Sequence, residues 1–69
     1  MILRELKIGD EFYHESYRHK KSMDIYKVSE NCIFNFGHGS STRICFNNNT
    51  RKFESKSCNL KVIKIEFPF

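Results

Sequence analysis

The sequence predicts a single all-β domain, residues 1–69, in which five or six short and mostly antiparallel strands form a small barrel. Three observations carry this prediction. The strand-forming residues Phe, Ile, Tyr and Thr take the place of the usual helix-forming residues, since Leu occurs three times and Ala not at all. Polar turn segments recur about every eight to twelve residues, as in small barrels and sandwiches. No stretch keeps the 3.6-residue period of an amphipathic helix, so no long helix is expected.

The chain opens with a turn that leads into the first strand. In "LKIGDEF", Gly9 tolerates a positive φ and Asp10 can accept hydrogen bonds from nearby backbone amides. The first strand, residues 11–17, alternates so that Phe12 faces inward. The segment 18–22, "RHKKS", is expected to be a charged loop.

The later strands are separated by polar turns. They are expected at residues 23–29, 32–36, 42–47, 51–55 and 60–67. A Gly-rich loop at 37–41 joins two of them into a hairpin, and Asn residues make the turn at 47–50. One short helical turn at 55–59 is expected before the last strand.

Strand alternation also predicts which side chains form the core. The expected core residues are Phe12, Tyr26, Val28, Phe34, Ile44, Phe46, Val62 and Ile65. In the strand 42–47, Ile44 and Phe46 then face inward, and Arg43 and Cys45 face outward. If the Phe46 ring is buried in this way, its replacement by Ala should cost about 3–5 kcal/mol.

Four stretches, "LKIGDEF", "DIYKVSEN", "TRICFNNNTRKFES" and "LKVIKI", follow one another in a recurrent pattern. This pattern resembles the small SH3-like barrels found in bacterial and phage genomes, with a Lys-x-Gly-Asp turn, a Tyr-x-Val strand and a Val-x-x-Ile closing strand. The resemblance covers residues 6–66 and implies the barrel architecture. The same architecture serves ribosomal, Tudor-like and peptide-binding domains, so it does not fix the function.

The three cysteines, Cys32, Cys45 and Cys58, form an odd set, which argues against a complete disulfide framework. The N-terminal residues carry charges and contain no apolar run long enough for a signal peptide or a membrane span. These observations predict a cytoplasmic protein in which all three thiols are free.

No pattern in the chain predicts an enzyme, a cofactor or a metal site. The cysteines lack the close C-x-x-C pairs of structural zinc sites. Cys45 and His38 lie across one hairpin, but no Gly-framed nucleophile accompanies them. The stretch "FGHGSS" lacks the Lys-Ser or Lys-Thr of a phosphate-binding loop. We therefore expect a non-catalytic module without a small-molecule substrate.

Basic and aromatic residues carry the strongest functional signal. The chain has 12 Lys and Arg against 8 Asp and Glu, a formal net charge of +4. Exposed aromatic rings can stack on bases, and basic side chains can neutralise phosphates. Nucleic-acid binding is therefore predicted through Tyr13, Tyr17, Arg18, Lys20, Lys21, Arg43 and Arg51. The alternative interpretation of these residues is an ordinary solvated surface.

A protein-interaction module is the alternative function, such as an inhibitor of a host protein encoded by a phage or another mobile element. It would use the aromatic face or the "FPF" tail at 67–69, which otherwise folds back onto the barrel. The protein is expected to be a monomer or a weak dimer with no membrane partner. Basic residues gathered on one face would favour nucleic acid, whereas an exposed apolar patch would favour a protein partner.

Overall fold

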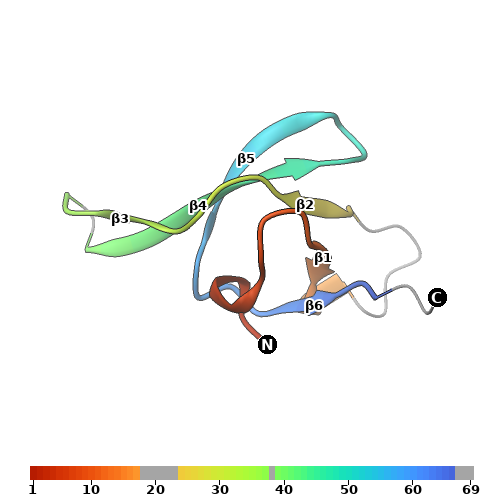
Figure 1. Ribbon diagram of the computed structural model, residues 1–69, viewed down its shortest axis with the longest axis horizontal. Helices are drawn as coiled ribbons and strands as arrows, with labels where there is room; N and C mark the ends of the chain where they lie inside the picture. Colours follow the sequence, from red (N-terminus) through yellow and green to blue (C-terminus); the bar gives the residue numbers. More distant parts are fainter. Residues whose placement is uncertain (18–23, 38, 67–69) are drawn as a thin grey trace.

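A single antiparallel sheet of six strands makes up most of the protein in the computed structural model, which describes residues 1–17, 24–37 and 39–66 (Figure 1). The elements are η1 (Leu3–Glu5), β1 (Glu11–His14), η2 (Glu15–Tyr17), β2 (Tyr26–Val28), β3 (Ile33–Asn35), β4 (Ser40–Asn47), β5 (Lys52–Ser57) and β6 (Val62–Lys64), where η denotes a short 3-10 turn. The predicted all-β class with six mostly antiparallel strands is confirmed.

The sheet is ordered β3-β4-β2-β1-β6, and β5 lies on the other edge of β4. The long strand β4 organises this arrangement. Its first half pairs with β3 and its second half with β2 along one edge, and β5 runs along the opposite edge. In the part of the chain that the structure describes, no strand pairing joins β5 to β6, so backbone hydrogen bonds do not close the sheet into a complete barrel.

The predicted opening turn is confirmed at Gly9, whose φ of 97° lies in the region that favours glycine. Asp10 stabilises the turn because its Oδ2 accepts a hydrogen bond of 2.8 Å from the Lys7 amide. Two more backbone bonds, both of 2.9 Å, join the turn to Val28: Gly9 N donates to Val28 O, and Val28 N donates to Asp10 O. The turn therefore holds β1 beside β2 from the first residues of the sheet.

The core contains four of the residues that alternation predicts: Phe12, Tyr26, Val28 and Val62 are buried. The Phe12 and Tyr26 rings stack with their centroids 5.4 Å apart. Leu3, Leu6 and Cys45 complete this cluster. The two leucines come from the segment around η1, which crosses the open side of the sheet and bonds to Leu60 through the Leu3 amide, at 2.9 Å.

The predicted faces of β4 are wrong. Arg43, Cys45 and Asn47 are buried, whereas Ile44 and Phe46 lie on the outer face and are half-buried. Arg43 faces inward because buried backbone carbonyls need its donors: Nη1 donates to Leu3 O at 3.0 Å and to Leu6 O at 2.9 Å. Alternation alone did not show this demand for hydrogen bonds.

Two further core assignments are corrected. Phe34 is exposed because β3 pairs with a part of β4 that extends beyond the core. Ile65 is half-buried, since it follows the end of β6. The helical turn expected at 55–59 is also absent: β5 continues through Ser57, and a tight turn at 58–59 leads toward β6.

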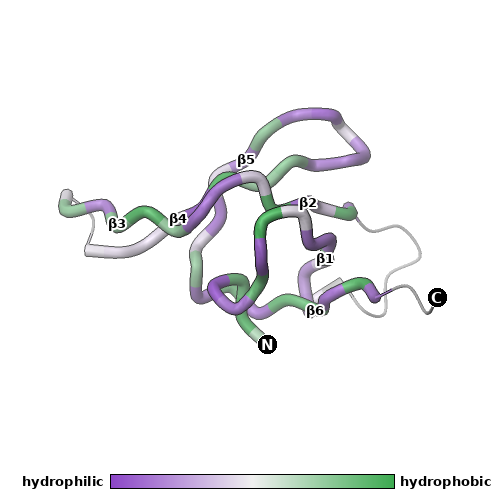
Figure 2. Tube along the Cα trace, in the orientation of Figure 1, coloured by the Kyte–Doolittle hydropathy of each residue, from purple (hydrophilic) through white to green (hydrophobic). Residues whose placement is uncertain are grey.

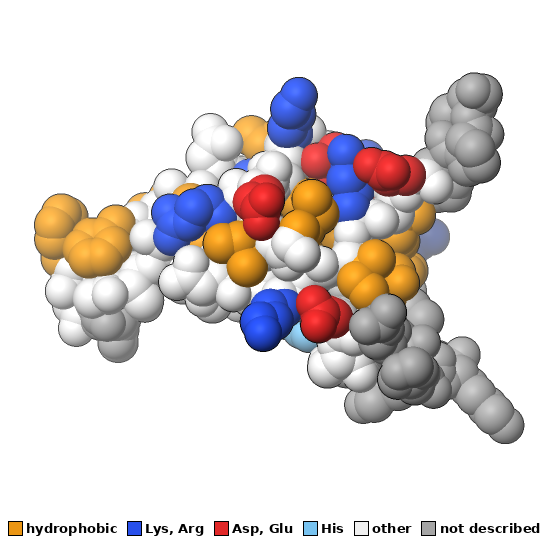
Figure 3. All heavy atoms as spheres, turned by 90° about the horizontal axis from the view of Figure 1, so that it is seen from below, with side chains coloured by type: hydrophobic (Ala, Val, Ile, Leu, Met, Phe, Trp, Pro, Cys, Tyr) orange, Lys and Arg blue, Asp and Glu red, His pale blue; other side chains and the backbone are white. Residues whose placement is uncertain are grey.

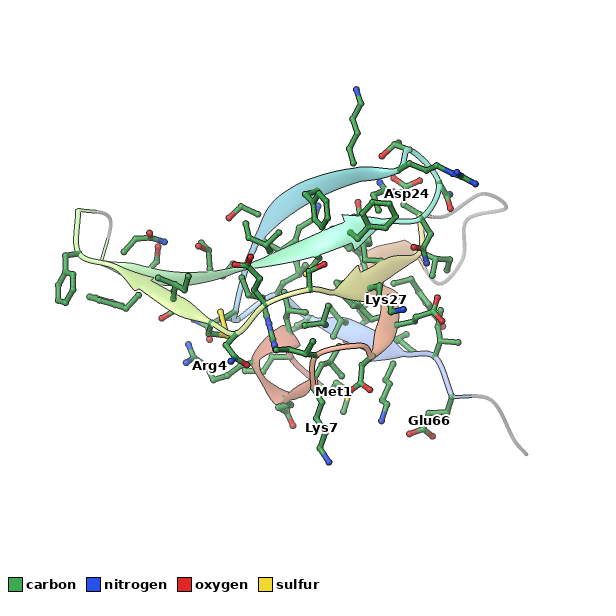
Figure 4. All side chains as sticks on the ribbon, turned by 45° about the horizontal axis from the view of Figure 1, so that its top comes forward. Met1, Arg4, Lys7, Asp24, Lys27 and Glu66 are labelled. Carbon is green, nitrogen blue, oxygen red and sulfur yellow. A yellow bond between two sulfur atoms is a disulfide. The ribbon has the colours of Figure 1, made fainter. Side chains whose placement is uncertain are left out.

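The prediction of three free thiols is wrong, because Cys32 and Cys58 form a disulfide whose Cα atoms are 6.3 Å apart (Figure 4). Cys32 precedes β3 and Cys58 follows β5, so the fold brings together residues that are distant in the sequence. Cys45 is free and buried, and this burial raises its pKa to about 11. An odd cysteine count excludes full pairing but not one bridge with one free thiol.

None of the described helical segments is long and apolar enough to cross a membrane.

Candidate interaction surface

The predicted nucleic-acid site is not assembled by the residues that the structure describes. Arg43 is only 3% exposed and cannot reach a phosphate, so its assignment to a binding surface is wrong. Tyr13 is half-buried on β1, and Arg51 is exposed in the turn between β4 and β5. The Tyr17 side chain and residues 18, 20 and 21 lie outside the described residues, so those four assignments stay predictions.

Basic charge is concentrated in the segment that lies outside the described residues. The described residues include nine Lys and Arg and all eight Asp and Glu, so Arg18, Lys20 and Lys21 supply most of the net charge of +4. Several of the other basic groups have acidic neighbours. Lys56 Nζ lies 3.1 Å from a Glu54 oxygen, and Lys64 Nζ lies 3.9 Å from an Asp10 oxygen. The described surface is therefore nearly neutral.

The β3–β4 hairpin projects from the rest of the sheet, at the left of Figure 1. Ile33, Phe34 and Asn35 pair with Thr42, Ser41 and Ser40 of β4. Gly39 has a φ of 63° in the connecting turn, and its amide donates to Asn35 O at 2.9 Å. The hairpin is therefore a regular antiparallel extension whose base is also paired with β5, through Thr42 and Ser57, although the core ends before it.

Three large apolar side chains of this hairpin lie in solvent, and we call Ile33, Phe34 and Phe36 the hairpin patch. Their exposed fractions are 56%, 49% and 91%. The rings of Phe34 and Phe36 meet edge to face, with their centroids 5.0 Å apart, and thus share one face of the hairpin. Hydropathy along the chain shows apolar residues in this projecting segment, and hydrophobic side chains gather at the same end of the surface (Figures 2 and 3).

The hairpin has no charged side chain of the Asp, Glu, Lys or Arg type. Residues 31–42 contain none, in a chain where 29% of residues are charged. Edge strands are commonly protected against pairing with other chains by charges or by Pro, and this hairpin has neither. The uncharged run was the sequence signal for this surface. Strand alternation instead assigned Phe34 to the core.

Among the described residues, no strand pairs with the outer edge of β3. Ser41 O accepts a 3.0 Å hydrogen bond from Cys58 N, so the backbone of Ser41 points away from β3. In an antiparallel pair, the backbone N–H and C=O groups of the two opposed residues point either toward each other or both away from each other. Phe34 is paired with Ser41, so its N–H and C=O point to the open edge.

Two contacts fix the base of the hairpin. The Cys32–Cys58 disulfide joins the residue before β3 to the residue after β5. Arg43 Nε donates to Glu30 O at 2.9 Å and so holds the segment that enters β3. The hairpin therefore leaves the body of the protein in a defined direction.

A second exposed aromatic pair lies on the outer face of the sheet. Lys27, Phe46 and Phe53 are aligned across β2, β4 and β5. The two rings meet with their centroids 5.0 Å apart, and Phe53 is 67% exposed. Lys27 is exposed on β2 (Figure 4), where it is paired with Phe46 of β4. We call these three residues the outer-face row.

A cluster of polar side chains fills the inner side of the sheet beside the core. Asn47 Nδ2 donates to Glu54 Oε2 at 2.8 Å and to Asp24 Oδ2 at 3.3 Å. Hydrogen bonds from Asn47 and then from Lys56 hold the pKa of Glu54 below its ordinary value. The members of this cluster satisfy one another, which is typical of a structural network.

The ring of Tyr26 links this cluster to the core. His14 stacks on it at 5.2 Å between centroids, and Lys56 Nζ lies 4.6 Å from the ring centroid. Burial lowers the pKa of His14 and raises the pKa of Tyr26. For Lys56, burial acts to lower the pKa, but hydrogen bonds to Glu54 and Tyr26 outweigh it and raise the pKa overall. These shifts follow from packing and require no ligand.

The described residues include no group of three or more His, Cys, Asp and Glu side chains that could hold a metal. One open hollow of about 450 Å³ is lined by Glu15, Ser16, Asn59, Leu60 and Lys61. It is open to solvent, and four of its five lining residues are polar or charged. The hairpin patch with its free edge is therefore the best-defined surface for recognition.

The chain matches no known protein-family profile, no curated protein and no solved structure.

Proposed function

We propose that this protein is a non-catalytic binding module that captures another protein through the β3–β4 hairpin. The partner supplies an extended segment that adds a strand to the free edge of β3. The observation that carries this proposal is the hairpin patch, in which Ile33 and Phe34 of β3 and Phe36 of the following turn are exposed on a projecting hairpin without Asp, Glu, Lys or Arg. Strand addition is a recurrent way of recognising peptides, in which backbone bonds give affinity and side-chain contacts give specificity.

The chemistry of the hairpin defines the partner. Phe34 and Phe36 are large apolar anchors of the kind that carry much of the binding energy at protein interfaces. With no Lys or Arg in residues 31–42, the hairpin cannot neutralise phosphates. The expected partner segment is therefore extended, with apolar side chains at alternate positions that pack against both rings. An inhibitor of a host protein is one form that such a module could take, within the SH3-like class suggested by the sequence.

Single-stranded nucleic acid is the second candidate ligand, because the outer-face row places two aromatic rings beside a lysine. Bases stack on such rings, and each stacked base contributes about 1–3 kcal/mol. Arg18, Lys20 and Lys21 would add phosphate contacts. We rank this function second because the described surface is nearly neutral overall.

The cellular setting of the binding event is a separate prediction. A cytoplasmic location, which the sequence predicts, keeps most thiols reduced, whereas disulfides persist in oxidising compartments. Alkylation during rapid denaturation of the host cells, which exposes the buried Cys45 and Cys58, followed by mass measurement, tests this prediction. Three modified thiols on recovery would support a reducing compartment.

The protein-binding function is tested by selecting binders from a library of extended peptides displayed on phage. Synthetic versions of the selected peptides should bind the folded protein, and Phe34→Ser or Phe36→Ser should weaken them at least about tenfold, as expected for interface anchors. Phe53→Ser is the matched control, since it removes a ring of intermediate exposure, 67%, on another surface and should leave affinity unchanged. Bound peptide should also protect the Phe34 amide from hydrogen exchange. Peptides that bind without contacting the hairpin would contradict the proposal.

Size-exclusion chromatography with light scattering tests whether a second copy occupies the same edge. The protein should be monomeric at micromolar concentration. A dimer that Phe34→Ser dissociates would replace the foreign partner by a second copy of the chain.

Nucleic-acid binding is tested by fluorescence titration with short single- and double-stranded oligonucleotides at low and high salt. If the outer-face row binds bases, Phe53→Ala should cost about 1–3 kcal/mol for single strands, and affinity should fall steeply with salt. The absence of binding at micromolar protein in low salt would end this second proposal.

A further inference from the structure

We propose that the Cys32–Cys58 disulfide is a redox-responsive clasp that fixes the binding hairpin when oxidised and loosens it when reduced. The bridge connects the strands on the two sides of β4, because Cys32 precedes β3 and Cys58 follows β5. The inference concerns regulation of the surface described above, and its binding consequence rests on the proposed function. The loosening of the hairpin is a separate and directly measurable claim.

The two cysteines of the bridge differ in burial. Cys58 is fully buried, whereas Cys32 is only half-buried at the base of the hairpin. Cys32 is therefore the side from which we expect a soluble dithiol to reach the bridge. The third thiol, Cys45, is buried and has a raised pKa, so it is present as the protonated thiol, a poor nucleophile for exchange. The Cys32–Cys58 disulfide can thus be reduced and formed again without competition from the Cys45 thiol.

Reduction proceeds by ordinary thiol–disulfide exchange with a dithiol as the reductant. A thiolate of the reductant attacks Cys32 Sγ, the S–S bond breaks, and the Cys58 thiolate leaves and takes up a proton. The second thiol of the reductant, as its thiolate, attacks the mixed disulfide and releases Cys32, which also takes up a proton. The protein gains two electrons and two protons, and the reductant becomes a disulfide.

Loss of the bridge affects β3 more than the rest of the sheet. After reduction, β3 keeps its short pairing with β4, and Arg43 Nε still bonds to Glu30 O at its base. No strand covers the other edge of β3 among the residues described. By contrast, β1 and β2 lie in the middle of the sheet and contribute Phe12 and Tyr26 to the core. Reduction should therefore increase local opening of the hairpin without opening the core.

This local opening would weaken binding. A rigid edge strand is already arranged to accept a partner strand, whereas a fluctuating one must be ordered at the moment of binding. The oxidised protein is therefore the high-affinity form, and the reduced protein is the low-affinity form. The redox conditions of the compartment would then determine which fraction of the protein can bind its partner.

Hydrogen exchange followed residue by residue by NMR tests the clasp without any ligand. The amides of Ile33 and Asn35, which the pairing directs toward β4, are the reporters, and the Val28 amide, bonded to Asp10 O at 2.9 Å, is the internal control. On reduction with dithiothreitol, exchange at Ile33 and Asn35 should accelerate about tenfold or more, while Val28 changes less than about twofold. No change at the reporters, or equal acceleration at Val28, would overturn the proposal.

Two variants distinguish the effect of losing the disulfide from other effects of the reductant. Cys32→Ser should show the fast exchange at Ile33 and Asn35 without reductant and should not respond to dithiothreitol. Cys45→Ala, which leaves the bridge intact, should respond like the parent protein. A parent-like response in Cys32→Ser would contradict the assignment of the effect to the bridge.

The binding consequence is measured with one peptide selected on the oxidised protein. Its affinity should fall about tenfold on reduction and should be unaffected by reductant in Cys32→Ser. Equal affinity for both redox forms would refute the regulatory role, even if exchange shows the hairpin loosened. If no peptide binds the oxidised protein at all, the proposed function fails and the exchange result alone decides whether the clasp exists.

Discussion

Replacing Arg43 by Ala should lower the free energy of unfolding by about 3 kcal/mol or more, since each buried acceptor left unsatisfied costs roughly 1–3 kcal/mol. Arg43 donates to the carbonyls of Leu3, Leu6 and Glu30, and the first two of these bonds are buried. A domain of this size has a total stability of only about 5 kcal/mol or so. The variant should therefore be close to unfolding at room temperature.

Urea titration followed by circular dichroism measures this effect, and three further variants define its cause. Arg43→Met keeps most of the volume but removes the donors, so it should be almost as damaging. Arg43→Lys should also be strongly destabilised, because one ammonium cannot reproduce the planar fork that reaches separate carbonyls. Arg4→Ala removes an exposed arginine and should change stability by less than about 0.5 kcal/mol. Equal stability of the Arg43→Ala and Arg4→Ala variants would rule out the internal role of Arg43.

Replacing Phe12 by Ala should cost about 3–5 kcal/mol, the usual range for removing a fully buried phenyl ring. Phe12 is completely buried in the middle of the sheet and stacks on Tyr26 at 5.4 Å. Its loss leaves a cavity in a core that few other large side chains can fill, because small domains bury little surface.

Two other phenylalanines provide graded controls for this prediction. The sequence assigns the large effect to Phe46, but that residue is half-buried on the outer face, so Phe46→Ala should cost clearly less than Phe12→Ala. Phe53→Ala, at an exposed position, should cost less again. Thermal unfolding of the three variants should follow this order. A larger cost for Phe46 than for Phe12 would restore the core predicted from the sequence and contradict the observed faces of β4.

The positions of several turns and strands were predictable from the residue types in short stretches of the sequence. Gly9 and Asp10 determine a turn wherever they occur between apolar residues, and Tyr26 and Val28 alternate with polar neighbours, as a half-buried strand requires. The order and orientation of the strands could not be obtained in this way. The position of β1 between β2 and β6 depends on contacts between residues far apart in the sequence.

The face of β4 was not predictable from apolar alternation, because both of its faces carry side chains that can be buried. Ile44 and Phe46 are the more apolar pair, but Arg43 is required inside by carbonyls contributed by a distant segment. Because side chains alternate, assigning one residue to the wrong side reverses the whole strand. The Cys32–Cys58 disulfide was not predictable either, because the number of cysteines does not show which of them pair.

Only part of the candidate surface could be predicted from the sequence. An exposed apolar patch was the stated sign of a protein partner, and residues 31–42 are unusual in lacking charge. What the sequence could not give is that β4 extends beyond the core and carries β3 with it. Phe34 and Phe36 are exposed for that geometric reason, although their residue type is typical of a core.

The pairing of β1 with β6 also determines when the protein can fold during its synthesis. While the ribosome is still adding residues 48–61, β1 has only β2 beside it, because Val62 and its neighbours have not yet been made. The nascent chain therefore carries Phe12 without the strand that covers it in the finished sheet. Loops closed over such long separations form slowly, and incomplete chains with exposed apolar strands tend to aggregate. Ribosomes that stall before Val62 should thus release a product that depends on chaperones or is removed by proteases.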